Sequence, residues 1–151
     1  MPEKETIRRA KEDKREGKSP STQAGEFVRE EMDHIREGRH GARSTKQAIA
    51  IGLSKARRAG VDLPPPKPGA VSERTRTQAK RDLAKGQAHP NQKPSPKRSR
   101  AVTKALQREG KSAASPAALG RQAKTAARKR GPSNRQANAR KAARTRRASG
   151  L

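Results

Sequence analysis

The residues of this chain that are best suited to chemistry are lysines and arginines, and the chemistry they offer is phosphate binding. Residues 64–151 carry 24 Lys and Arg against three acids, whereas residues 1–63 carry 15 against 11. A run of uncompensated cations attracts a polyanion, which in a cell usually means nucleic acid. The sequence therefore predicts phosphate contacts from a set of cations in the second part of the chain: Lys97, Arg98, Arg100, Lys104, Arg121, Lys124, Arg128, Lys129, Arg130, Arg135, Arg140, Lys141, Arg144, Arg146 and Arg147.

The composition favours duplex DNA over RNA as the partner. Phe27 is the only aromatic residue, and single-strand platforms and common RNA readers stack bases on aromatic side chains. Contacts to phosphates carry little sequence preference, and their strength falls steeply with salt. Two alternatives stay open: an RNA- or ribosome-associated basic factor, and a protein-interaction adaptor.

One short element, Ser95-Pro96-Lys97-Arg98, resembles the Ser-Pro-basic-basic elements of histone tails. A turn at the proline would place Lys97 and Arg98 in a narrow minor groove. An ordinary helix cap explains the same residues. We favour the cap, because a single copy of so short a pattern carries little information.

No grouping of residues predicts catalysis. The chain has no cysteine, no phosphate-binding glycine loop and no Ser/His/Asp arrangement, and a small core offers no dry pocket that would shift a pKa. His34 and His40, with Asp33 and Glu37, carry metal-ligating atoms, but we favour surface charge pairing over a metal site. The sequence therefore predicts a binding protein rather than an enzyme, with no metal and no cofactor.

Helices must position the cations, and the first of them form a predicted hairpin in residues 19–61. Apolar residues recur at helical spacing over about 21–38 and 45–59, and an S-x-x-Q capping box opens the second helix at Ser44. A charged N-terminal helix in residues 1–18 precedes the hairpin. The fold class is therefore expected to be mostly α.

The second helix of the hairpin has small residues on one face, at Ala48, Gly52 and Ala56. They permit close approach either by the first helix or by a second copy of the chain. If the hairpin were a helix-turn-helix, its second helix would also contact DNA. We favour a scaffold or self-association unit, because no third helix with a good apolar face is expected behind the pair. The residues of this helix that would contact DNA are Lys46, Lys55, Arg57 and Arg58.

A proline-rich linker at residues 62–69 is the predicted domain boundary, and a Lys/Arg/Ala-rich tail fills residues 70–151. The tail repeats one pattern loosely, with a serine cap, a run of Ala, Lys and Arg, and a glycine stop. Its segments lack apolar faces, and like charges repel along them. We therefore expect a largely disordered or transiently helical tail. The predicted segment starts are Ser72, Ser95, Ser115 and Ser133, and the predicted ends are Gly86, Gly110, Gly131 and Gly150.

The phrase KQAIAIGLSKARRAG, residues 46–60, resembles the signature of a bacterial family of small basic proteins with a domain of unknown function. The likeness covers about residues 19–66. It implies a bacterial origin and a helical hairpin, and it brings no catalytic residues. By composition alone, the tail resembles those of linker histones and bacterial histone-like proteins. No apolar run reaches the length of a membrane span, so we expect a cytoplasmic, nucleoid-associated protein.

Overall fold

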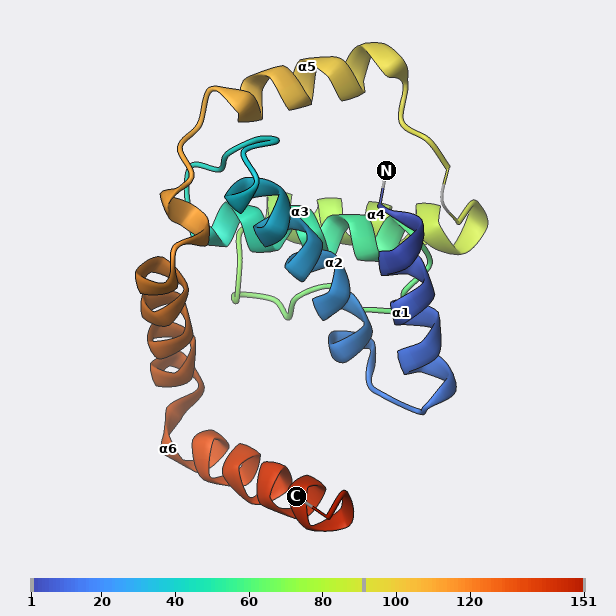
Figure 1. Cartoon of the computed structure of the whole chain (residues 1–151). Coiled ribbons are helices and arrows are strands. Elements are labelled where there is room, and N and C mark those ends of the chain that lie inside the picture. Colours follow the sequence, from blue (N-terminus) through green and yellow to red (C-terminus); the bar gives the residue numbers. More distant parts are fainter. Residues whose placement is uncertain (1, 91, 151) are drawn as a thin grey trace. The chain divides into compact units, whose positions relative to one another are not determined.

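The computed structural model describes residues 2–90 and 92–150, and over these residues the fold is mostly α-helical, as predicted. The chain divides into two compact units, residues 1–115 and residues 116–151. In chain order the elements are α1 (Lys4–Arg15), α2 (Pro20–Arg36), α3 (Thr45–Arg58), α4 (Glu73–Ala88), α5 (Pro96–Gln107), the 3-10 helix η1 (Ser112–Ala114) and α6 (Pro116–Ala148) (Figure 1). None of the helices in the described residues is long and apolar enough to span a bilayer.

Serine caps begin four of these helices, and three of the caps, at Ser44, Ser72 and Ser95, lie at predicted places. The hydroxyls of Ser19, Ser44, Ser72 and Ser95 each accept a hydrogen bond from the backbone N–H three residues later, at 3.1–3.3 Å. Each bond satisfies one of the N–H groups that a helix start leaves without a partner. The local pattern of serine, proline and helix formers therefore sets where the helices start.

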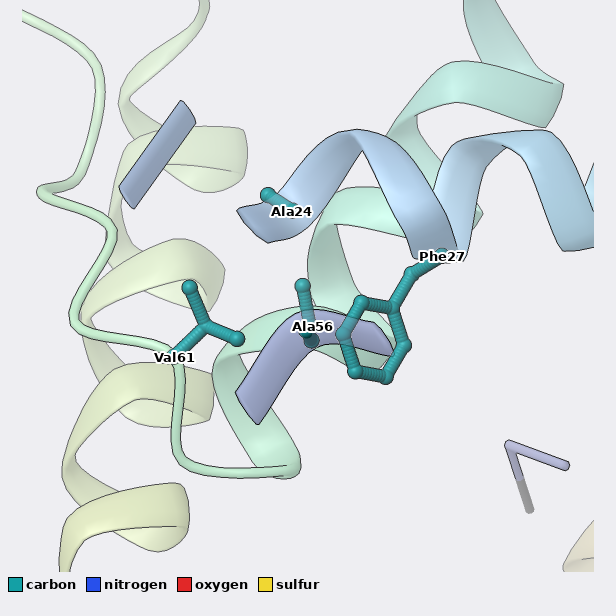
Figure 2. Close-up of a cluster of buried hydrophobic side chains, with 5 residues drawn as sticks. Ala24, Phe27, Ala56 and Val61 are labelled. Carbon is teal, nitrogen blue, oxygen red and sulfur yellow. The ribbon is translucent and has the colours of Figure 1, made fainter. Parts of the chain in front are cut away.

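The apolar core of the first unit is built from α1, α2 and α3. Ala10, Ala24, Phe27, Ala56 and Val61 form one buried cluster, and Figure 2 shows the ring of Phe27 beside Ala56. The chain folds back after α3, where the backbone N–H of Val61 donates to the carbonyl of Ala56 at 3.0 Å. This bond is typical of a chain that turns back onto the last turn of a helix.

The backbones of α2 and α3 meet at Gly52. A Cβ placed on Gly52 would lie 2.7 Å from the Cα of Val28 and 2.9 Å from its nitrogen. The small residues on either side, Ala48 and Ala56, are fully buried. The small face of α3 is therefore used inside the chain, against α2, and the alternative of a second copy on this face does not apply.

No third helix with a good apolar face was expected behind the hairpin, and two further helices do pack there, α1 on α2 and α4 on α3. The α4 contact lacks an apolar stripe; it buries Ala79, Asp82 and Gly86. A Cβ on Gly86 would lie 1.7 Å from the carbonyl oxygen of Arg57, so only glycine permits this approach. The chain therefore remains within one compact unit beyond the proline-rich segment 62–69, and the division between units falls at residues 115 and 116.

The tail was expected to be largely disordered or transiently helical, and disorder is not supported. Most of residues 73–148 is helical in α4, α5 and α6. The predicted starts are largely right, and the break predicted at Gly131 is present, with φ of 80°. The sequence pattern did not predict that these segments would be stably helical. Part of that stability comes from the tertiary contacts of α4. The rest comes from alanine, arginine, lysine and glutamine, which favour helix intrinsically.

Replacing Gly52 by alanine should destabilise the first unit by about 1–3 kcal/mol, because the added methyl meets the backbone of Val28. Gly25→Ala is the matched control. It lies in α2, exposed, and among the described residues nothing lies within 4 Å of the place that its Cβ would take. The control should be stabilising by about 0.5–1 kcal/mol, since alanine favours helix over glycine. Urea unfolding followed by circular dichroism measures both, and equal stabilities would contradict the close packing of α2 on α3.

Candidate nucleic-acid interface

The second unit presents the largest set of uncompensated cations. Within its described residues, α6 buries none of its side chains, and the chain has no Asp or Glu after Glu109. Its cations are therefore in water, without a local acid to neutralise them. The eleven that were predicted as phosphate contacts are all exposed: Arg121, Lys124, Arg128, Lys129, Arg130, Arg135, Arg140, Lys141, Arg144, Arg146 and Arg147.

Helical spacing groups some of these cations on shared faces. Arg121, Lys124 and Arg128 lie three and four residues apart, and neighbours at this spacing lie on the same side of a helix. Beyond Gly131, Arg140, Arg144 and Arg147 repeat the arrangement. At about 1.5 Å of rise per residue, the charges of each group follow one another at about 4.5–6 Å. Each half of α6 thus offers a row of cations to a phosphate backbone.

Gly131 separates the two halves. Its φ of 80° and ψ of 168° are not helical, and a side chain would strain the backbone there. Pro132 follows and fits the first turn of the second half, where its missing N–H costs nothing. Figure 1 shows the resulting break within α6. The turn gives two short rows of cations rather than one continuous rod.

The helix α5 adds four predicted contacts, Lys97, Arg98, Arg100 and Lys104, all exposed. Ser95 Oγ accepts from the backbone N–H of Arg98 at 3.3 Å, and Pro96 occupies the first turn. The Ser-Pro element is therefore a helix cap in the structure, which is the interpretation favoured from its sequence. Lys97 and Arg98 sit in the first turn of a helix instead of in a free turn.

The four cations of α3 divide into one that is exposed and three that serve the fold. Lys46 is exposed. Lys55 bonds to the buried carboxylate of Glu31, and Arg58 lies 3.9 Å from Asp82. Because α2 covers one side of α3 and α4 covers another, the helix does not present the open face that a recognition helix needs.

Arg57 is 6% exposed and holds the segment that follows α3. Its Nε donates to the carbonyl of Leu63 at 3.1 Å and its Nη2 to that of Pro64 at 3.0 Å. Burial lowers the pKa of its guanidinium, and the charge of Asp82 opposes that shift. Arginine stays protonated regardless, so the side chain clamps the proline-rich segment in its charged form.

Acids of the first unit are also engaged within it. Asp82 of α4 accepts from Ser54 Oγ at 2.5 Å and from Gln78 Nε2 at 3.2 Å. Near the N-terminus, a hydrogen bond from Arg39, at 2.7 Å, is the main reason that the pKa of Glu3 is lowered, and His34 adds to it. These carboxylates therefore bind partners inside the first unit.

Two histidines lie together where α2 ends. His34 and His40 meet edge to face, with ring centroids 6.0 Å apart. The acid that joins them is Glu31, rather than Asp33 or Glu37, which were named with them from the sequence. Glu31 and His34 form an E-x-x-H spacing on one helix face, and that spacing is a signal the sequence does contain. The approach of His40 depends on the loop after Gly38, which no spacing rule predicts.

Arg57→Gln should lower the free energy of unfolding by about 1–3 kcal/mol, because two carbonyls lose a charged donor. It should leave nucleic-acid affinity unchanged at temperatures where the protein is folded. Lys46→Gln is the comparison on the same helix, and as an exposed change it should alter stability by less than about 0.5 kcal/mol. Thermal melts and binding titrations on both variants test this. A loss of affinity in folded Arg57→Gln would show that the arginine contacts the nucleic acid.

Residues 15–67 match the model of a family of unknown function (DUF6496), which covers α2, α3 and the proline-rich segment. The match lies over the hairpin and leaves α4, α5 and α6 outside it. No curated protein and no solved structure matches the chain. The hairpin is thus the part of this chain that is similar to a family of unknown function.

Proposed function

We propose that this protein binds nucleic acid without sequence preference, duplex DNA foremost, through phosphate contacts from α6 and α5. The observation that carries the proposal is the character of α6, a helix of exposed cations with no acid in its sequence. Phosphate contacts fix a protein on a duplex without reading bases. The proposal is for a binding protein rather than an enzyme.

The length of α6 supports contacts along a duplex. At about 1.5 Å per residue, each half extends over roughly 20–25 Å, while duplex DNA carries one charge per ~1.7 Å of its axis. Each row of cations thus passes many phosphates. The helix also has no aromatic side chain for stacking, which favours a duplex over single strands. In a bacterial cell, which the phrase at residues 46–60 suggests, the target would be nucleoid DNA.

Salt dependence is the first test. If about ten cations engage phosphates at once, the slope of log affinity against log salt should be near −9. Fluorescence anisotropy with a labelled duplex of mixed sequence, titrated at several salt concentrations, measures this slope. Affinity that is weak at low salt, or insensitive to salt, would refute the proposal.

The location of the contacts is tested by two triple variants with the same change in charge. The first variant changes three arginines of α6 to Gln: Arg140, Arg144 and Arg147. It should make the slope of log affinity against log salt shallower by about 2–3 units, since each lost phosphate contact removes about 0.9 from that slope. The control changes Lys11, Lys14 and Arg15 of α1, which are also exposed, and it should leave the slope unchanged. If both triple variants changed the slope equally, affinity would depend on the net charge of the protein rather than on contacts made by α6.

Competition between duplex DNA and structured RNA decides the class of nucleic acid. Unlabelled duplex DNA should displace the probe at lower concentration than RNA of equal phosphate content. Stronger displacement by RNA would favour the alternative of an RNA- or ribosome-associated factor.

A further inference from the structure

Three potential metal-binding side chains converge where α2 ends. Glu31 and His34 lie one turn apart on α2, and His40 lies in the following loop. One ligand atom from each of the three lies within 4.8 Å of the others. Two histidines and a carboxylate are a ligand set used by zinc and by other divalent transition metals.

The environment of Glu31 is the strongest indication that a metal ion binds here. The Glu31 side chain is fully buried, at 0% exposed. Oε1 is taken by Lys55, whereas Oε2 has no hydrogen-bond partner in the structure. His40 Nε2 lies 3.1 Å from Oε2 but without hydrogen-bond geometry. A buried carboxylate oxygen without a hydrogen bond is costly, and a bound cation would remove that cost.

The distance between Glu31 and His40 fits two ligands of one ion. With metal–ligand bonds of about 2.0–2.1 Å, neighbouring ligands of a tetrahedral zinc lie about 3.3 Å apart. The observed 3.1 Å between Oε2 and Nε2 is close to that spacing. A ligand atom of His34 lies within 4.8 Å of both of these atoms.

The backbone holds His40 in the form that binds metal. Its Nδ1 lies 2.9 Å from the carbonyl oxygen of Gly41. Because a carbonyl only accepts, Nδ1 donates in this contact, which leaves Nε2, the nitrogen that faces Glu31, as the atom that would bind a metal. Metal-bound histidines are commonly oriented by such a bond from the second ring nitrogen. His34 Nε2 lies 3.2 Å from Glu3 Oε1 and 3.1 Å from Arg39 Nη1, so these contacts do not fix which of its ring nitrogens carries the proton.

Nearby cations limit the strength of this site. Lys55 neutralises Glu31 and occupies Oε1, so the carboxylate would bind through Oε2 alone. Arg39 lies 3.1 Å from His34 Nε2 and also pairs with Glu3. The neighbouring group of Glu3, Glu30 and His34 is the weaker candidate, because Arg39 holds Glu3.

We propose that Glu31, His34 and His40 bind one divalent transition-metal ion, with zinc the best fit to the ligand set. Three protein ligands leave a fourth position for water. The ion would fix the loop after α2 to the helix. That loop also holds a distant part of the unit, since the backbone N–H of Gly41 donates to Leu106 and that of Ala42 to Gly110. Metal binding would therefore stabilise the first unit and is independent of the proposed nucleic-acid contacts.

The test uses the full chain without an affinity tag and without nucleic acid. Titration with Co²⁺, a spectroscopic substitute for Zn²⁺, should saturate at one equivalent with visible absorption bands typical of four-coordinate Co²⁺. Thermal melts should shift upward as free Zn²⁺ rises. A wild-type chain that shows neither one-equivalent binding nor a Zn²⁺-dependent shift overturns the proposal, whatever the variants do.

The three histidines of the chain provide variants and a matched control. His34→Gln and His40→Gln should each weaken metal binding at least tenfold and remove the Zn²⁺-dependent melting shift. His89→Gln changes the exposed third histidine and should keep both. Circular dichroism without metal checks that each variant is folded. Undiminished binding in folded His34→Gln or His40→Gln, or an equal loss in His89→Gln, would overturn the assignment.

Discussion

Close backbone approach along α3 is the constraint on which the first unit depends. Gly52 brings the backbone of α2 against one side of α3, and Gly86 brings α4 against its C-terminal end. The largest fully buried side chains are only Phe27, Ile35 and Glu31. With so few large apolar groups, the unit gains little from side-chain burial, and dense contact between backbones and alanines must supply much of the attraction. Adding one methyl group at either glycine should therefore lower the stability of the whole unit.

The same constraint determines which charges remain for binding. Because α4 approaches α3 so closely, Asp82 is buried beside Ser54, and Arg57 is directed onto the carbonyls of the proline-rich segment. Glu31 and Lys55 pair between α2 and α3. These buried charges are costly unless they are paired, so they are bound within the unit and do not face a macromolecular partner. The cations of α6 have no such packing to serve, and their charge remains directed at solvent.

Local features of the sequence predict the helices well. The features that the sequence did not predict depend on tertiary contacts between distant residues. A serine hydroxyl at Ser72 or Ser95 caps a helix through bonds within four residues, so its effect can be read locally. The packing of α4 depends on Gly86, which resembles a helix stop in sequence but serves as a contact with Arg57. For the candidate interface, the exposure of α6 follows from its lack of an apolar face. The internal role of Lys55 does not, because its partner is 24 residues away.

Helical order in α6 bears on how tightly the cations can hold a polyanion. A disordered basic segment that folds on binding spends part of its interaction energy on ordering the chain, at about 1–2 kcal/mol per residue of backbone. A segment that is already helical avoids that cost. Its cations, such as Arg140 and Arg144, already lie in rows before the segment meets a polyanion. If α6 binds nucleic acid as proposed, counterion release rather than folding would govern its affinity. Repulsion among those cations opposes the helix in the free chain, so neutralisation by phosphates would stabilise the same rows that make the contact.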